Sequence, residues 1–157
     1  MECGNDVHYL INCYNSGKVS GNAIAGGIAG ELQFIENGFE GKIINCYNTG
    51  EIQAKTYAGG IVGLKRGYGT HYVENCYWKE ELNLECGNNK NSVNNGILEI
   101  TNSREYKEKE MKEASFLQVL NDYAQTYNQG DKSLTNGKEL MGWNFSEETG
   151  FPMPMEE

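Results

Sequence analysis

Short apolar segments separated by turn residues make up the N-terminal half of the chain, from position 1 to position 80. The segments are rich in β-branched and aromatic residues and are too short for helices, so they predict strands. The tripeptides Asn15-Ser16-Gly17 and Asn48-Thr49-Gly50 predict turns, because glycine and asparagine accept a positive φ at little cost. The clearest of the predicted strands are residues 10–14, 43–47 and 73–77.

An internal repeat runs through these segments at one constant offset of 33 in the numbering. Residues 11–19 return as residues 44–52, and residues 25–30 return as residues 58–63. A third partial copy, Asn75-Cys76-Tyr77, follows at a shorter offset of 30, and we expect the array to stop there. A unit with a few short strands cannot bury its own apolar face, so the copies must stack. The repeat therefore predicts a mainly β fold, a short right-handed β-solenoid or β-helix-like array of about two and a half rungs.

The residues that recur are expected to have structural roles. The strand alternation leaves open whether the cysteines or the asparagines and tyrosines face the interior, and a bulge between them would satisfy both. We favour inward cysteines, with Glu74 at the edge of its rung, because free cysteine is among the most buried residue types. For the glycines we expect a turn or a close contact between rungs. The structural repeat residues are Cys13, Cys46, Cys76, Asn12, Asn45, Asn75, Gly27 and Gly60.

The chain contains five cysteines, an odd number, and three of them occupy equivalent repeat positions. Free, buried thiols are favoured over disulfides, because an oxidised framework normally shows paired spacings. Cys76 and Cys86 are the best candidates for a disulfide if one forms. A zinc site is disfavoured, since no pair of cysteines has the spacing of zinc ligands.

Residues 81–157 follow a different pattern, and we expect them to form a cap on the same domain as the repeats of residues 1–80. Apolar residues recur at steps of four, three and four, which predicts an amphipathic helix over about residues 107–127. We expect this helix and a closing strand to cover the open end of the last rung, because a solenoid exposes unpaired strand edges unless it is capped. The apolar residues assigned to the cap are Phe116, Leu120, Tyr123, Tyr127, Trp143 and Phe151.

The block Asn-Cys-Tyr-Asn-Ser/Thr-Gly-x-Val/Ile, followed by Gly-Gly-Ile-x-Gly, resembles the GLUG-motif repeat of bacterial cell-surface and secreted proteins. The resemblance extends through Cys76-Tyr77-Trp78 to Gly150-Phe151-Pro152 and covers most of residues 8–154. It implies an extracellular or cell-surface location and a non-catalytic role in adhesion or as a scaffold. An accessory, non-catalytic region of a secreted peptidase is the alternative that the same resemblance implies.

The charge of the chain is uneven. The formal net charge is −9, and residues 1–80 contain 6 Lys+Arg against 8 Asp+Glu, whereas residues 81–157 contain 7 against 14. This acidic balance argues against binding of nucleic acid, whose phosphates require a basic surface. No run approaches the roughly 20 apolar residues that a membrane helix needs, so we expect no membrane insertion.

The start of the chain suggests a neighbouring partner. Residues 1–15 lack the basic start and apolar stretch of a signal peptide. The Gly-Gly-Ile-x-Gly block that would precede the first Asn-Cys-Tyr is also missing. We therefore expect the sequence to be the C-terminal part of a longer array, packed against the preceding repeats of its parent chain.

Candidate chemistry is sparse, and we expect neither a cofactor nor a catalytic site. The common hydrolase and nucleotide-binding motifs do not occur, although a carbohydrate-active β-helix enzyme using carboxylates such as Glu74 is the alternative. The best ligand-binding candidate is the stretch 65–72, expected as an exposed insertion whose tyrosines would stack on a glycan or contact a host or cell-surface protein. A merely exposed turn is the competing interpretation. The candidate binding residues are Arg66, Tyr68 and Tyr72.

Overall fold

The computed structural model describes residues 7–36, 38–80, 85–89, 96–132, 135 and 137–155. The first strands are β1 (Val7–Ile11), β2 (Tyr14–Asn15), β3 (Val19–Gly21), β4 (Ile24–Gly26) and β5 (Ala29–Phe34). They are followed by β6 (Glu40–Ile44), β7 (Tyr47–Asn48), β8 (Ile52–Ala54), β9 (Tyr57–Gly59) and β10 (Val62–Gly67). Next come β11 (Thr70–Glu74), β12 (Tyr77–Lys79), β13 (Gly87–Asn89), β14 (Ile97–Thr101) and β15 (Arg104–Tyr106). The C-terminal part contains the 3-10 helix η2 (Glu110–Lys112), the helix α1 (Ala114–Gln129), and strands β16 (Trp143–Phe145) and β17 (Pro152–Pro154).

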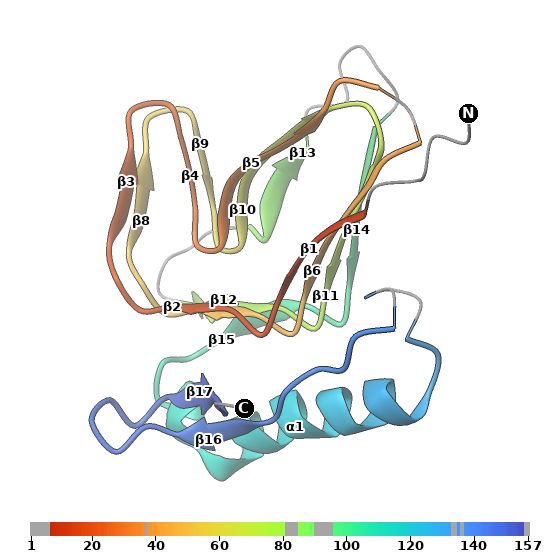
Figure 1. Ribbon diagram of the computed structural model, residues 1–157. Helices are drawn as coiled ribbons and strands as arrows, with labels where there is room; N and C mark the ends of the chain where they lie inside the picture. Colours follow the sequence, from red (N-terminus) through yellow and green to blue (C-terminus); the bar gives the residue numbers. More distant parts are fainter. Residues whose placement is uncertain are drawn as a thin grey trace.

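Strands of successive repeats pair in parallel. The sheets have the orders β1-β6-β11-β14, β2-β7-β12-β15 and β5-β10-β13, with two further pairs, β3-β8 and β4-β9. We refer to β1–β5 as the first rung, β6–β10 as the second, β11–β13 as the third and β14–β15 as the fourth. In Figure 1 corresponding strands of successive rungs overlie one another around a common interior. The expected mainly β fold is confirmed, and its parallel sheets are compatible with a β-helix-like arrangement.

The array continues beyond its expected end at Trp78. Strand β14 pairs with β11 in register, with Ile100 opposite Val73, and β15 pairs with β12. Ser103 takes the place of the recurrent cysteine, and its Oγ accepts a hydrogen bond of 2.9 Å from the backbone N–H of Cys76. The prediction of two and a half rungs was therefore too short, because a serine in the cysteine position hides this copy from a search for Asn-Cys-Tyr.

A left-handed asparagine at the same corner of every rung settles the strand phase. Asn12, Asn45, Asn75 and Asn102 have φ values of 51°, 55°, 51° and 48°, and they are the only residues other than glycine with positive φ in the described part. Such a residue reverses which side chains face inward. Ile43 before the corner and Cys46 after it both pack in the interior, whereas Ile44 and Tyr47 face outward. A single left-handed residue thus allows the aliphatic residue before it and the cysteine after it both to face inward, while the tyrosine faces outward. Glu74 lies on the outer side with Ile44.

Side chains of one kind stack from rung to rung. The amide of Asn45 donates to Oδ1 of Asn12 at 2.9 Å, and the amide of Asn75 donates to Oδ1 of Asn45 at 2.8 Å. In the neighbouring row the backbone N–H of Cys13 donates to Sγ of Cys46 at 3.3 Å. The expected stacks of asparagines and of inward thiols are both present.

Close contact between rungs explains the recurrent glycines. A Cβ at Gly27 would lie 2.5 Å from Cγ of Asn48, and one at Gly60 would lie 2.3 Å from Cγ of Trp78. Neither glycine has a positive φ. Glycine is therefore required at these two positions because no room is left for a side chain, and not because of the backbone conformation. This confirms the expected close contact between rungs.

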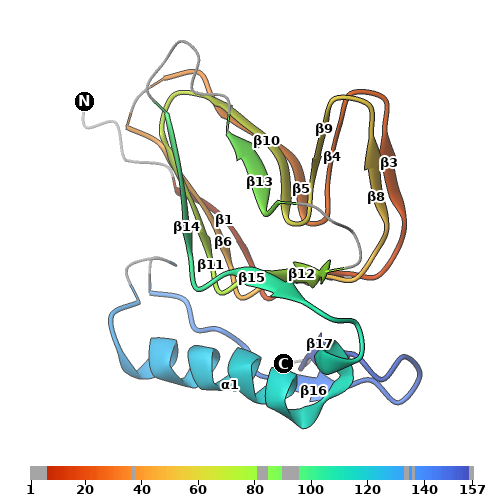
Figure 2. The ribbon, with the colours of Figure 1, turned by 180° about the vertical axis from the view of Figure 1, so that it is seen from behind.

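The C-terminal segment packs against the outer face of the β2-β7-β12-β15 sheet. Figures 1 and 2 show α1 and the antiparallel β16-β17 pair beneath this sheet from opposite viewpoints. Tyr47 and Tyr77 of the sheet form one buried cluster with Phe116 and Trp143, and the ring of Tyr47 meets that of Phe116 edge-on at 5.6 Å. Ile44 lies in a second cluster with the C-terminal half of α1.

The expectation that this helix covers the open end of the last rung was therefore wrong. The helix runs across the rungs on their side, because the left-handed corner turns a large residue outward in each of them. Ile11, Ile44, Tyr47 and Tyr77 form an apolar outer strip that must be covered. The helix also begins later than predicted, at Ala114 rather than near residue 107, because residues 110–112 form a 3-10 turn.

We predict that Asn45 contributes through both its backbone conformation and its side chain. Replacing it by alanine removes two buried hydrogen bonds and puts a residue that tolerates the left-handed region less well than asparagine at this corner, which should lower the free energy of unfolding by roughly 3–5 kcal/mol. Asn45→Gly loses only the hydrogen bonds and should cost roughly 2–3 kcal/mol. Urea unfolding followed by circular dichroism measures both values.

The matched control is Asn102, which has a similar φ of 48° but is exposed in the fourth rung. Asn102→Ala should cost only the conformational term, roughly 1 kcal/mol. Equal losses for Asn45→Ala and Asn102→Ala would contradict a stabilising role of the asparagine stack.

Candidate functional site

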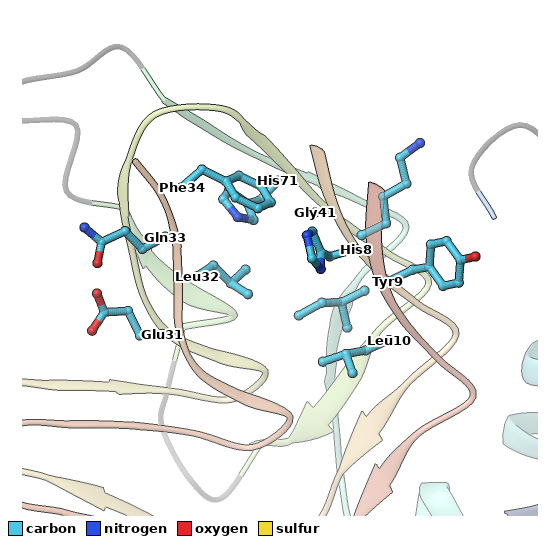
Figure 3. A pocket seen from close by; sticks show the side chains of 11 residues that line it. His8, Tyr9, Leu10, Glu31, Leu32, Gln33, Phe34, Gly41 and His71 are labelled. Carbon is cyan, nitrogen blue, oxygen red and sulfur yellow. The ribbon is translucent and has the colours of Figure 1, made fainter. Parts of the chain in front are cut away.

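A cavity of about 550 Å³ lies at the end of the interior formed by the first rung, between β1, β5 and β6. In Figure 3, Leu10, Leu32 and Phe34 point into this cavity, whereas Glu31 and Gln33 point away from it. Its volume is within the range of small-molecule sites, roughly 300–1,000 Å³. The other lining residues are His8, Tyr9, Gly41, Lys42, Ile43 and His71.

Three adjacent strands place a glycine between two histidines at this cavity. His8 of β1 is the register partner of Gly41 of β6, which in turn is the partner of His71 of β11. A Cβ at Gly41 would lie 2.4 Å from Cδ2 and 3.0 Å from Nε2 of His71. Gly41 therefore leaves the space into which the His71 ring fits.

The side chain of Phe34 packs against both imidazoles. Its ring stacks on His71 with centroids 4.6 Å apart and an interplanar angle of 13°, and it lies 5.7 Å from the ring of His8. Figure 3 shows the Phe34–His71 pair at one wall of the cavity and His8 beside Gly41. The cavity is thus lined by these aromatic rings together with the aliphatic side chains of Leu10, Leu32 and Ile43.

Burial keeps the His71 ring neutral. The side chain is 2% exposed, and its Nδ1 has no hydrogen-bond partner among the described residues. Desolvation, with a smaller contribution from the nearby Lys65 ammonium, lowers the pKa of His71 to about 4. At neutral pH the wall of the cavity therefore carries no charge at this position, and a neutral imidazole can donate or accept one hydrogen bond.

Lys65 has a structural role in the same region. It is fully buried, and its Nζ donates to the carbonyl oxygen of Gly67 at 2.9 Å. Burial lowers the pKa of this lysine. The hydrogen bond fixes the turn between β10 and β11, where Gly67 and Gly69 have φ values of 75° and 73°.

The expectation that residues 65–72 form an exposed insertion was wrong. Residues 65–67 complete β10 and residues 70–72 begin β11, so only a tight turn remains between them. The offset of the third copy is shorter because the connection between β10 and β11 is shorter than that between β5 and β6, while the strands keep their lengths. The sequence repeat alone does not show which of the two has changed. Lys65 and His71 of this stretch are buried.

The three predicted binding residues do not form one site. Arg66 forms an ion pair with Glu31 of β5. Tyr68 lies in the turn, where its N–H donates to the carbonyl oxygen of Phe34 at 2.9 Å. Tyr72 belongs to a different sheet, with Nζ of Lys42 5.7 Å from its ring centroid. Arg66 and Tyr72 therefore face different partners.

Tyr72 is part of a polar and aromatic row on the outer face of the β1-β6-β11-β14 sheet. Tyr9, Lys42, Tyr72 and Glu99 are register partners on the four successive strands. Lys42 pairs with Glu40 at 3.0 Å, and Lys138 lies 4.9 Å from the ring centroid of Tyr9. Desolvation, with the carboxylates of Glu40 and Glu99, raises the pKa of Tyr72.

The described cysteines are free thiols. Cys46 and Cys76 are fully buried, Cys86 is buried and Cys13 is half-buried, while Cys3 lies outside the described residues. Burial raises the pKa of Cys46 above its usual range and that of Cys86 to about 12. Since the thiolate is the reactive form, these groups are poor nucleophiles and poor metal ligands.

Comparison with models of protein families, with curated proteins and with solved structures gives no match to this chain. Within the described ranges no group of three or more His, Cys, Asp or Glu side chains is placed to hold a metal ion. None of the helices described is long and apolar enough to cross a membrane. The site must therefore be interpreted from its own geometry.

Sequence reasoning missed the cluster of His8, Phe34 and His71. The signal that would have found it is the spacing of the histidines, because their numbers differ by the sum of the two repeat offsets, 33 and 30. This spacing places them at equivalent positions, with Gly41 between. Phe34 has no such signal, because its partner position in the second rung is Gly67.

We predict that His71 makes stability depend on pH. In the unfolded chain histidine titrates near 6.5, but in the folded protein His71 titrates near 4, so between these values the unfolded state binds more protons. The free energy of unfolding should therefore fall as the pH decreases from 6.5 to 4, with a His71 contribution of roughly 2–3 kcal/mol.

His71→Leu should flatten this pH dependence, since Leu98 occupies the equivalent position in the next strand. His8→Gln is the matched control and should retain the slope, because His8 is exposed at the same cavity. Urea unfolding at several pH values measures the slopes. An unchanged slope in His71→Leu would show that other groups cause the pH dependence.

We also predict that the stacked thiols are unreactive in the folded protein. Cys46, Cys76 and Cys86 should resist iodoacetamide under native conditions and react fully in urea, because each is buried. Cys13, half-buried at the open first rung, should react at an intermediate rate. Peptide mass spectrometry identifies each site, and native alkylation of Cys46 or a Cys76–Cys86 disulfide would contradict the prediction.

Proposed function

We propose that the chain is a non-catalytic, surface-exposed adhesion or scaffold module of the GLUG-repeat type. Its strands form a short right-handed β-solenoid, and the C-terminal segment braces the side of that solenoid. The module works outside the cell or at its surface, as the C-terminal part of a longer bacterial surface protein. Its partners are the preceding repeats of that protein and a glycan or a cell-surface protein of a host.

The stack of buried asparagines carries this proposal. Asn12, Asn45 and Asn75 recur because each bonds to its copy in the next rung, at 2.9 and 2.8 Å. The cysteines and glycines that recur are likewise used in contacts between rungs. Residues that define the repeat thus maintain a shape and are not presented to a substrate, which is the design of a scaffold.

The outer row of Tyr9, Lys42, Tyr72 and Glu99 is the surface that we assign to adhesion. Parallel strands are about 4.8 Å apart, so Tyr9 and Tyr72 are separated by about 10 Å with the Lys42 ammonium between them. Tyrosine combines an apolar ring with a polar hydroxyl, which suits contact with sugars or with protein surfaces. Within this row Glu99 is exposed, Tyr9 and Tyr72 are half-buried, and Lys42 is buried.

Binding and turnover measurements on a panel of immobilised polysaccharides and cell-surface glycoproteins test the proposal. We expect binding without release of product, weakened roughly tenfold by Tyr9→Ala combined with Tyr72→Ala, which corresponds to about 1.4 kcal/mol. Arg66→Ala is the matched control and should bind normally, because Arg66 lies on a different sheet.

Turnover of any glycan that is abolished by Glu74→Gln would contradict the proposal and favour a carbohydrate-active enzyme. Glu74 is half-buried in the outer side of β11, where its carboxylate contributes to raising the pKa of the buried Tyr123 hydroxyl. This placement beneath α1 favours a structural role for the carboxylate.

A further inference from the structure

Among the described residues, no further rung covers the interior of the first rung. Leu10, Ile43, Val73 and Ile100 form one interior row across the β1-β6-β11-β14 sheet. The two middle residues are 1% and 0% exposed, whereas Leu10 and Ile100 at the ends are 40% and 42% exposed. The cavity of about 550 Å³ lies where the interior of the first rung opens to the surface. Each end of the row therefore exposes an aliphatic surface that another rung would bury.

The backbone of the first rung is also available on this side. Strands β1, β2, β3, β4 and β5 each lie at the edge of their sheet among the described residues. Five edge strands at one end of the molecule can pair with further strands, because a strand edge presents unpaired N–H and C=O groups.

The two ends differ in how their edges are protected. Proteins normally keep free edges from pairing by placing charged residues or proline on them. Strands β1 to β4 contain no Asp, Glu, Lys, Arg or Pro, and β5 contains one charged residue, Glu31, which is paired with Arg66 of β10. The strands of the fourth rung, in contrast, carry Glu99, Arg104 and Glu105. The last edge is thus protected as a free edge, and the first edge has the composition of a covered one.

Local contacts specify what would fit on the first edge. Between the existing rungs, the backbone at Gly27 packs against Asn48 of the next rung, and Gly60 packs against Trp78. Asn15 is the counterpart of Asn48 in the first rung, and its amide already bonds to Asn48 at 2.8 Å. An incoming rung must therefore present a glycine to Asn15, as rungs of this repeat do.

The Asn12 amide has a second N–H with which it can bond to an incoming rung. It donates to the carbonyl oxygen of Met141 at 2.6 Å, and a side-chain amide carries two N–H groups. The second N–H can meet an asparagine of an incoming rung, as the amide of Asn45 meets Asn12. The C-terminal segment is therefore compatible with extension of the stack.

We propose that the first-rung edge, formed by β1–β5 and the cavity behind Leu10, is a docking site for one further rung of the same repeat in the same polypeptide, paired in parallel with β1. This inference rests on the proposed function only in taking the chain as a repeat module. It adds that a further rung pairs with the first rung and not with the fourth. The aliphatic row, the uncharged strands β1–β4 and the position of Asn15 select a rung of this type over an unrelated strand.

Internal duplication tests the proposal with the full chain. A variant in which residues 1–44 are followed by residues 12–157 adds one complete repeat, and its junction of Ile44 to Asn12 copies the natural junction of Ile44 to Asn45. We expect one cooperative transition, a higher urea midpoint, and an m-value larger by roughly a fifth, since m scales with the surface exposed on unfolding. The control inserts the same segment in scrambled order and should raise neither value.

An unchanged m-value and midpoint in the duplicated chain would overturn the proposal, as would an equal gain in the scrambled control. Sedimentation velocity of the original chain supplies the second test. Self-association that is abolished by Leu10→Glu would show that a second copy occupies the edge, which contradicts docking within one polypeptide. Monomeric behaviour together with the gain on duplication supports it. Neither result depends on the glycan measurements, so failure of the adhesion proposal remains distinguishable.

Discussion

The left-handed asparagine at the corner of each rung is the constraint on which the rest of the structure depends. An L-residue in this conformation is unfavourable, and asparagine is the side chain other than glycine that tolerates it best. Here the side chain also satisfies a buried row of amides, so one residue type solves two problems. Glycine would allow the turn but would leave the row without hydrogen bonds, and glutamine or serine would not favour the turn.

The corner also determines that the protein has two apolar surfaces. It turns Ile43 and Cys46 into the interior, and it turns Ile44 and Tyr47 outward at the same time. A stack of such rungs therefore carries an apolar strip on its side, which must be buried because large apolar patches favour association. Helix α1, Trp143 and Phe151 bury it, and the hydroxyl of Tyr47 donates to the carbonyl oxygen of Pro152. The geometry of the repeats thus explains why a C-terminal segment packs on their side.

The parts of this fold that repeat could be predicted from the sequence, and the parts that depend on single substitutions could not. The constant offset between copies predicts parallel stacking and the roles of Cys46, Asn45 and Gly60, because identical residues at one offset must meet their copies. The side placement of α1 could not be predicted, because the outward direction of Ile44 follows from the φ of Asn45, which no pattern of apolar residues contains. The cavity was missed for a related reason, since His8 and His71 become neighbours of one glycine only when the shortened third repeat is in register.

The same interactions explain how the stack ends. The Asn48 position of the third rung is Trp78, which fills the interior and ends the second asparagine row. In the first row the hydroxyl of Tyr77 donates to Oδ1 of Asn75 at 2.5 Å, so at the third rung this oxygen accepts from a tyrosine, and Asn102 of the fourth rung is exposed. At the opposite end the same row meets the carbonyl oxygen of Met141 with one N–H and keeps the other. The row therefore accepts from a tyrosine hydroxyl at the third rung and keeps a second N–H to donate at the first. The edge strands also differ in charge, since β1 carries no Asp, Glu, Lys or Arg and β14 carries Glu99. This second difference involves other residues than the asparagine row. Two independent features thus distinguish the two ends of the array.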